Sequence, residues 1–313
     1  MRKKHDRIGY GTALLLMVLI LLAGCGKKED IVQDSSVQES SSVTEISENR
    51  IQEEKDNAEL SPESEEDVQR FSFKDVYGQV YEVTLNEEAL LHDYDMSYLH
   101  TDGYFKTYDV PGYTSRVGID VSKFQGDIDW QRVKDDGVEA AYIRLGYRGY
   151  SSGEIVVDEK YEDNISACND IGLDCGVYFF TEALNEDEAR EEADFCIENL
   201  GEYSTTLPIA IDVEESANVS KSRTKDLSVE QRTLNVIAFC ERIREKGYEP
   251  IIYGNLKSLM IMTDLSKLEE YDKWFAYYHY PLRFPYKIKM WQYSATRRVD
   301  GIEGDVDLNL MFY

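Results

Sequence analysis

Histidine and basic residues are scarce in this chain, and each shortage excludes a class of function. Only four of the 313 residues are histidines, and His279 is the only one of them after residue 113. Catalytic zinc sites usually need histidine ligands, so we expect no metal ion and no other cofactor. Lys and Arg together number 34 against 61 Asp and Glu, which gives a net charge of −27. So acidic a chain is not expected to bind nucleic acid.

The cysteines do not form a metal-binding pattern. There is no Cys-x-x-Cys pair, and no histidine lies near Cys168, Cys175, Cys196 or Cys240. These four residues fall within apolar helix and strand patterns, so we expect them to be small buried hydrophobic residues. A disulfide between two of them stays open, because connectivity cannot be deduced from sequence.

The longest apolar run covers residues 13–23 and follows a basic start at residues 2–4. It is shorter than the roughly 20 residues that a membrane-spanning helix needs. Its position and flanks are those of a secretory signal. The residues Leu22-Ala23-Gly24-Cys25 also resemble the lipobox of bacterial lipoproteins. This resemblance implies a signal peptide over 1–24, cleavage before Cys25, and a lipid on Cys25 that anchors the protein to the outside of the cell membrane.

The next two segments differ sharply in composition. Residues 25–69 are rich in Glu, Ser, Asp and Gln and contain no aromatic residue. Such a segment buries too little apolar surface to offset its chain entropy, so we expect a disordered acidic tether. Residues 70–113 are rich in tyrosine, and the alternation at 71–73 and 81–85 predicts two strands with a turn at Gly78. We expect a small N-terminal extension that packs on the main domain.

Strand and helix patterns alternate from residue 116 onward. Asn185 with Glu188, and Ser228 with Gln231, have the spacing of helix caps. About eight strands over roughly 200 residues fit an α/β fold of the TIM-like barrel type, with 114–313 as the main domain. The strands are predicted at 117–121, 140–145, 175–180, 207–214, 250–253, 274–278, 288–293 and 306–312, and the helices at 128–136, 159–171, 185–201 and 228–247.

Four carboxylates lie near the ends of predicted strands. Side chains alternate along a strand, so Asp212 and Glu214 point to the same face. Two carboxylates held close together cannot easily both ionise, and one pKa should rise. Asp120 also lies near a strand end, where the catalytic groups of such barrels are found. Asp307 lies near the start of its strand, so its placement at the same edge is less clear.

Several motifs together resemble one family of carbohydrate-cleaving enzymes. Residues 117–313 are similar to family 25 glycoside hydrolases, the muramidases called Chalaropsis-type lysozymes. The motifs occur in the order of that family, whereas residues 70–113 lie outside the resemblance. The matching pieces are Gly118-Ile119-Asp120-Val121-Ser122 with Gln125-Gly126, Gly176-Val177-Tyr178-Phe179, Asp212-Val213-Glu214, Trp291-Gln292-Tyr293-Ser294, Gly301-Ile302-Glu303-Gly304 and Val306-Asp307-Leu308-Asn309.

The resemblance implies an irregular (β/α)5β3 barrel that cleaves the β-1,4 bond between N-acetylmuramic acid and N-acetylglucosamine in peptidoglycan. Glu214 is then the candidate general acid, with its pKa raised by the Asp212 charge. Asp212 would act as nucleophile or would orient the acetamide of the substrate. We expect retention of configuration, because the two carboxyls are close. The resemblance places Asp120 and Asp307 in the same site.

Aromatic residues near strand ends are candidates for the wall of a glycan groove. Sugar rings have apolar C–H faces that pack on aromatic rings, although core packing explains most buried aromatic residues. We select Tyr178, Tyr253 and Trp291 as substrate-binding residues.

Three other functions stay open from the sequence. Clustered Asp and Glu can bind divalent ions, as in a metal-dependent hydrolase, but the histidines are too few for zinc. A chitinase-like barrel also uses an Asp-x-Glu strand end, but the flanking motifs fit the muramidases better. A lipoprotein could also keep the fold and bind wall glycan without cleaving it.

Overall fold

The computed structural model describes residues 70–313, except 76–77, 86–90 and 217–218. The predicted signal peptide, Cys25 and the predicted tether therefore lie outside the described residues. Among the helices of the described part, none is long and apolar enough to cross a membrane.

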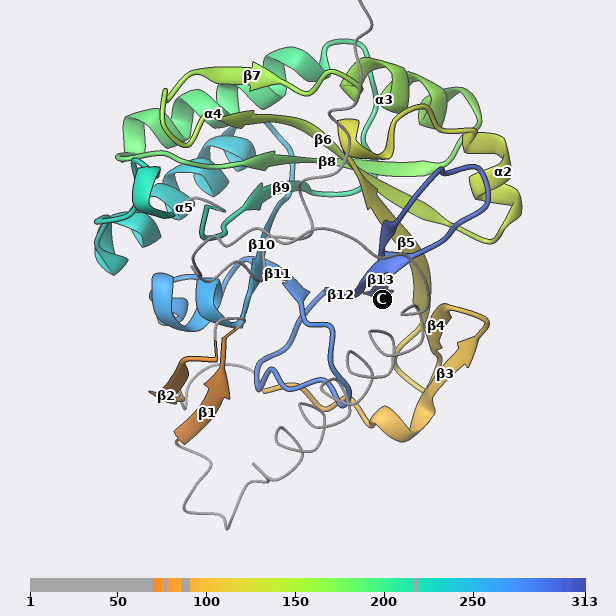
Figure 1. Cartoon of the computed structure of the whole chain (residues 1–313), viewed down its shortest axis with the longest axis horizontal. Coiled ribbons are helices and arrows are strands. Elements are labelled where there is room, and N and C mark those ends of the chain that lie inside the picture. The colour runs from red at the N-terminus through yellow and green to blue at the C-terminus, as the bar shows by residue number, and fades with distance from the viewer. Residues whose placement is uncertain (1–69, 76–77, 86–90, 217–218) are drawn as a thin grey trace, which may run out of the picture. The chain divides into compact units, whose positions relative to one another are not determined.

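Eight strands close into a barrel, as Figure 1 shows. Six consecutive pairings from β5 to β12 are parallel, and β13 closes the ring by pairing antiparallel with both β12 and β5. The predicted closed α/β barrel is thus confirmed. Its strands are β5 (Ser115–Val121), β6 (Ala140–Arg148), β8 (Asp174–Phe180), β9 (Ile209–Asp212), β10 (Pro250–Asn255), β11 (Asp272–Ala276), β12 (Met290–Arg297) and β13 (Val306–Phe312).

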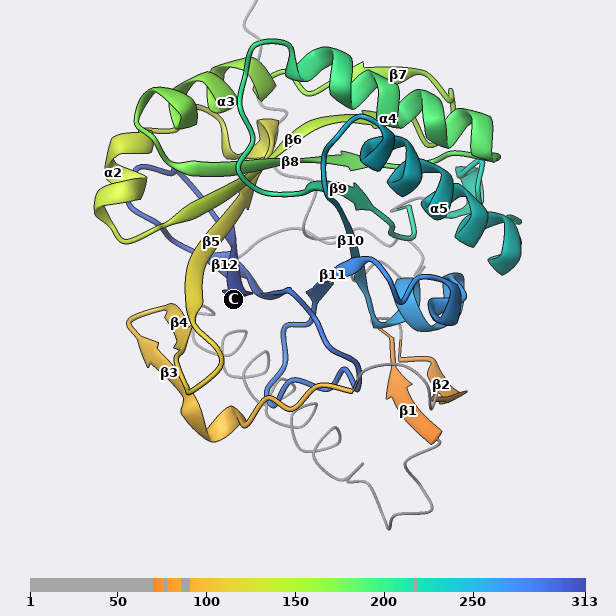
Figure 2. The same cartoon turned by 180° about the vertical axis from the view of Figure 1, so that it is seen from behind.

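Four α-helices connect the first barrel strands and lie outside them (Figure 2). They are α2 (Trp130–Asp135), α3 (Tyr161–Asp170), α4 (Glu186–Leu200) and α5 (Val229–Glu245). Both predicted caps are confirmed: the Asn185 side chain accepts a hydrogen bond from the Glu188 N–H at 3.0 Å, and Ser228 Oγ accepts one from the Gln231 N–H at 3.1 Å. Each cap satisfies an N–H that the first helical turn leaves unpaired.

The C-terminal half of the barrel is less regular than the first half. Only short helices follow β10, namely the π-helix η5 (Ser258–Met262) and the 3₁₀-helix η6 (Leu265–Lys267). The strand β11 begins and ends two residues before its predicted bounds, and β12 begins two and ends four residues after its predicted bounds. A short strand that the sequence patterns missed, β7 (Ile155–Val157), pairs antiparallel with the end of β6.

Alternate residues of each strand face two different hydrophobic clusters. The inner cluster contains Tyr142, Tyr253 and Trp274, and fills the barrel. The outer cluster lies between the strands and the helices and includes Trp291, which is 1% exposed. The four described cysteines, Cys168, Cys175, Cys196 and Cys240, are buried and free, as expected for small hydrophobic residues.

The N-terminal extension packs against the barrel on the side where strands have no covering α-helix. The Tyr94 ring stacks on Phe312 with 4.5 Å between centroids, and the Tyr94 hydroxyl donates a hydrogen bond to the Ile288 carbonyl oxygen at 2.5 Å. Thus the extension supplies apolar cover that helices supply elsewhere. Its elements are β1 (Arg70–Lys74), β2 (Val80–Thr84), η2 (Met96–Tyr98), β3 (Leu99–Asp102) and β4 (Phe105–Tyr108).

We predict that Tyr94→Ala lowers the free energy of unfolding by about 3 kcal/mol, because it removes a buried aromatic ring from the outer cluster. Tyr98→Ala is the matched control: Tyr98 is 49% exposed, and its loss should change the free energy by less than about 0.5 kcal/mol. Urea unfolding of the two variants measures both values. Equal, small effects would show that the extension is not part of the core.

Candidate active site

The four predicted carboxyl groups come together at one end of the barrel. Asp120 lies near the end of β5, Asp212 ends β9, and Glu214 follows two residues later. Asp307 lies near the start of β13, but β13 runs antiparallel to β5, and Asp307 is the direct cross-strand partner of Asp120. The start of an antiparallel strand meets the ends of the parallel ones, and this explains how Asp307 reaches the same edge.

Asp120 is held as a hydrogen-bond acceptor inside the barrel. It is 6% exposed, and its Oδ2 accepts hydrogen bonds from Gln292 Nε2 and Asn309 Nδ2, each at 2.8 Å. Burial raises the pKa of Asp120 to about 6, and the hydrogen bonds from Asn309, Gln292 and Asp307 lower it in part. Two amide donors on one oxygen favour the ionised form.

Aromatic side chains fix which way the two amides point. The Gln292 Oε1 accepts hydrogen bonds from the hydroxyls of Tyr253 at 2.9 Å and Tyr278 at 2.8 Å. The Asn309 Oδ1 accepts one from Trp274 Nε1 at 2.7 Å. Because both amide oxygens are occupied by donors, both amide nitrogens face Asp120.

Asp307 carries the proton of the Asp120–Asp307 pair. Burial raises the pKa of Asp307 well above its usual range, and the charge of Asp120 and their shared hydrogen bond raise it further. Asp120 has the lower pKa of the two because it alone receives the amide donors. In this pair the proton therefore favours Asp307 and the negative charge favours Asp120.

Asp212 and Glu214 form a second pair and share a hydrogen bond. Burial, followed by the charge of Glu214, raises the pKa of Asp212 well above its usual range. The pKa of Glu214 is raised to about 7. The Oδ1 atom of Asp212 is buried and has no hydrogen-bond partner among the described residues. A buried acceptor without a donor is costly, so this oxygen is available to a donor from a water or from a ligand.

The cause of the raised Glu214 pKa differs from the expectation. The sequence indicated the charge of Asp212, but burial is the largest cause, and the charge of Asp120 adds to it. The hydrogen bond with Asp212 lowers the Glu214 pKa instead, because protonated Asp212 donates to Glu214. The charge that the sequence assigned to Asp212 is therefore provided by Asp120.

Arg144 is a cation that acts on this carboxyl cluster. It lies on β6, where its cross-strand partner on β8 is Tyr178, and it lowers the pKa of Asp212 through its charge. Its Nε and Nη2 donate to Asp158 Oδ2 at 2.7 and 2.6 Å. Since Asp158 is fully buried at its side chain, the guanidinium has a fixed position.

The predicted aromatic residues do not all lie at this site. Tyr253 belongs to the inner cluster and Tyr178 packs against it, and the charges of the carboxyl groups act on both phenols. Trp291 does not lie at this site, and the prediction for it is wrong. Trp291 faces the outer cluster, and its Nε1 donates to the Tyr277 carbonyl oxygen at 2.7 Å. Its neighbour Gln292 is the residue of this segment that faces the site.

A buried carboxylate anchors the loop that follows Glu214. Glu182 is 1% exposed and lies two residues after β8. It accepts hydrogen bonds from the hydroxyls of Ser216, Ser222 at 3.0 Å and Thr224 at 2.6 Å. These contacts tie the loop to the strand end beside it, and thereby fix the backbone on the C-terminal side of Glu214.

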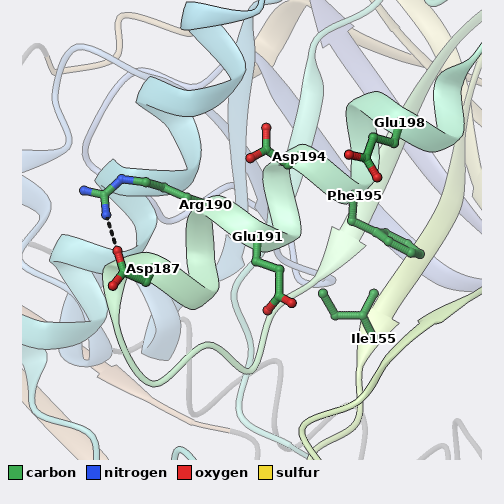
Figure 3. A pocket seen from close by; sticks show the side chains of 7 residues that line it. All are labelled: Ile155, Asp187, Arg190, Glu191, Asp194, Phe195 and Glu198. Carbon is green, nitrogen blue, oxygen red and sulfur yellow. Dashed lines mark hydrogen bonds and ion pairs between the residues drawn. The ribbon is translucent and has the colours of Figure 1, made fainter.

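Two hollows on the described surface differ in their relation to the carboxyl cluster. The one in Figure 3 lies over α4 and β7, and side chains such as Asp187, Arg190 and Phe195 line it, none of which belongs to the carboxyl cluster. The other borders Glu214 and extends between Ser216, Arg232 and η5. Among the described residues, no group of three or more His, Cys, Asp or Glu side chains is arranged to hold a metal ion.

A closed barrel with paired carboxyl groups at the carboxyl ends of its strands has the features of a glycoside hydrolase. Residues 119–302 match the family model described as Glycosyl hydrolases family 25. The chain therefore belongs to glycosyl hydrolase family 25.

Characterised relatives share this domain. Lysozyme M1 of Streptomyces globisporus is 31% identical over 211 residues, which are 64% of this chain and 69% of that protein. The bacterial lysozyme of Streptomyces coelicolor has a similar structure, with a TM-score of 0.52 and 28% identity over 62% of this chain and 90% of that chain.

The modular autolysin LytC of Streptococcus pneumoniae shares the fold, with a TM-score of 0.59 and 24% identity. The match covers 78% of this chain but only 57% of the LytC chain. LytC has also been solved in complex with a synthetic peptidoglycan ligand.

The raised Glu214 pKa predicts how stability depends on pH. Folding raises this pKa from 4.5 to about 7, so the folded protein binds the proton more tightly. The contribution of Glu214 to stability is full below about pH 4.5 and is lost as the pH rises through about 7. Glu214→Gln removes this titration. The melting temperature of the variant minus that of the unaltered protein should therefore be larger at about pH 8 than at about pH 5.

Thermal unfolding at the two pH values measures this difference. Glu198→Gln is the control, because Glu198 is exposed on α4. A Glu214→Gln difference that does not change with pH would contradict the raised pKa.

Proposed function

We propose that this protein is a muramidase that hydrolyses the β-1,4 bond between N-acetylmuramic acid and N-acetylglucosamine in peptidoglycan. One observation carries the proposal: Asp212 and Glu214 share a hydrogen bond at the barrel end, and both have raised pKa values. Family membership supports the glycosidic chemistry, and the lysozyme relatives and the peptidoglycan ligand of LytC support the choice of substrate.

Glu214 is the proposed general acid. With a pKa of about 7 it keeps a proton at slightly acidic pH, and it can donate this proton to the leaving glycosidic oxygen. When that proton leaves, Glu214 becomes a carboxylate near the negative charge of Asp120. The positive charge that develops on the sugar in the oxocarbenium-like transition state offsets this repulsion. The Asp120 charge thus contributes negative potential that favours this state, and Asp307 holds the proton of the pair and donates a hydrogen bond to Asp120.

Asp212 is proposed to orient the acetamide group of the substrate. An inverting enzyme needs carboxyl groups about 6.5–9.5 Å apart to hold a water between them, and a direct hydrogen bond leaves no such room. Retention is therefore expected. The unpartnered Asp212 Oδ1 fits an acetamide N–H as its donor, which favours substrate assistance over direct attack by Asp212. Tyr178 and Tyr253 are proposed as walls for the same sugar.

We also infer the (β/α)5β3 form of the barrel. Four strand–helix units come first, namely β5–α2, β6–α3, β8–α4 and β9–α5. The fifth unit is β10, which is followed by the short helices η5 and η6 in place of an α-helix. The three remaining barrel strands are β11, β12 and β13.

The proposed place of action is outside the cell membrane, on the peptidoglycan beside it. The lipobox-like residues at Cys25 support a lipid anchor, and the acidic segment 25–69 would give the barrel reach. A single acyl chain holds a protein only marginally, so a stable anchor at Cys25 needs more than one chain.

The test is digestion of purified peptidoglycan followed by reduction and identification of the new reducing-end sugar. Muramic acid at that end is the expected product, and Glu214→Gln should reduce its release by at least about 100-fold, because general acid catalysis contributes that much. Glu198→Gln, an exposed change of the same chemistry, should keep full activity.

Three results would count against this function. Glucosamine at the new reducing end would indicate a glucosaminidase, and glycan binding with no release of fragments would indicate a binding protein. Full activity of Glu214→Gln would remove Glu214 from its role.

A further inference from the structure

Phe124 is a large apolar side chain that the fold holds in solvent at the edge of the carboxyl cluster. It is 49% exposed and lies in η3 (Lys123–Gln125), directly after the strand that carries Asp120. Covering this apolar surface with the apolar face of a ligand would remove it from water and is favourable.

Hydrogen bonds on both sides of Phe124 fix its backbone. Ser122 and Gln125 form a reciprocal cap around η3. The Lys123 N–H donates to Asp158 Oδ2 at 3.2 Å, and Gln125 Nε2 donates to the Asp305 carbonyl oxygen at 3.3 Å. The exposed position of Phe124 therefore comes from a rigid turn and not from a loose loop.

A cation holds the ring itself. The Arg144 guanidinium carbon lies 5.1 Å from the centroid of the Phe124 ring, within the range of a cation–π contact. Arg144 is in turn held by its ion pair with Asp158. The charge of the same guanidinium lowers the pKa of Asp212, so Arg144 links the Phe124 ring to the carboxyl cluster.

A second exposed ring lies across the barrel end. Tyr278 is 52% exposed and follows β11, which is three strands away from β5 around the closed sheet. Its hydroxyl donates to Gln292, which in turn donates to Asp120. The carboxyl cluster is thus flanked by one half-exposed ring on each side.

We propose that Phe124 is a stacking platform for a pyranose ring of the glycan, on the side of the carboxyl cluster opposite Tyr278. The inference rests on the proposed function, because it takes the ligand to be a glycan strand. An aromatic ring presents an apolar face, and a sugar presents a matching face of C–H groups. Ligand sites combine such apolar walls with a few placed polar groups, here the carboxyls and Arg144.

Binding without turnover tests this platform. In a Glu214→Gln background, affinity for soluble, purified peptidoglycan fragments is measured by calorimetry. Phe124→Ala should weaken binding by about tenfold, the scale expected for the loss of one aromatic contact. Phe124→Trp should restore it, because it keeps an aromatic face. In the active protein, Phe124→Ala should raise KM with little change in kcat.

Tyr150→Ala provides the matched control. Tyr150 is 41% exposed and lies in the turn between β6 and β7, so it is a half-exposed ring outside the carboxyl cluster. Its loss should leave the affinity unchanged. Melting temperatures of both alanine variants should lie within a few degrees of their parent, since each side chain is only about half buried.

The outcomes separate this platform from the proposed function. If the Glu214→Gln parent binds the fragments and Phe124→Ala binds them equally well, the platform is wrong and the muramidase proposal stands. A Phe124→Trp variant as weak as Phe124→Ala would also overturn it. If the parent binds no fragment and the unaltered protein releases no muramic acid ends, both proposals fall.

Discussion

The hydrogen bonds from two amides to the buried Asp120 carboxylate determine the charge state of the whole site. Gln292 and Asn309 keep Asp120 ionised in a place where burial favours the neutral form. The proton of that pair then belongs to Asp307. The Asp120 charge in turn helps to raise the pKa of Glu214, so a carboxyl near the barrel end keeps a proton at a pH where an exposed glutamic acid is ionised.

This arrangement depends on how the barrel closes. β13 runs antiparallel to β5, which puts Asp307 and Asn309 beside Asp120 and Gly118 in the shared register. The last strands have no α-helices outside them, and the extension before residue 114 covers them with aromatic residues such as Tyr94. The extension therefore supports the same strands that carry the amide donors, although it lies outside the matched family segment of residues 119–302.

Much of the fold follows from the sequence, because strand and helix periods and two caps are local signals. The side of the sheet that a strand residue faces is not given by a local signal. Barrel strands are buried on both sides, so Trp291 and Gln292 sit in one apolar run without an alternation that shows which side is inner. A polar residue inside such a run, such as Gln292 or Asn309, is the feature that marks the side facing the carboxyl groups. The prediction of Asp212 and Glu214 as neighbours needed only strand alternation, whereas the cause of the Glu214 pKa needed Asp120, which is distant in sequence.

Direct titration of the carboxyl groups tests this charge distribution most sharply. Carbon NMR of protein labelled at its Asp and Glu carboxyls, followed from about pH 3 to about pH 9, resolves groups that titrate far above the usual range of about 4. One carboxyl that titrates near pH 7 and disappears in Glu214→Gln is the expected result. Titration of every Asp and Glu carboxyl below about pH 5 would contradict the claim that burial and Asp120 keep a proton on Glu214.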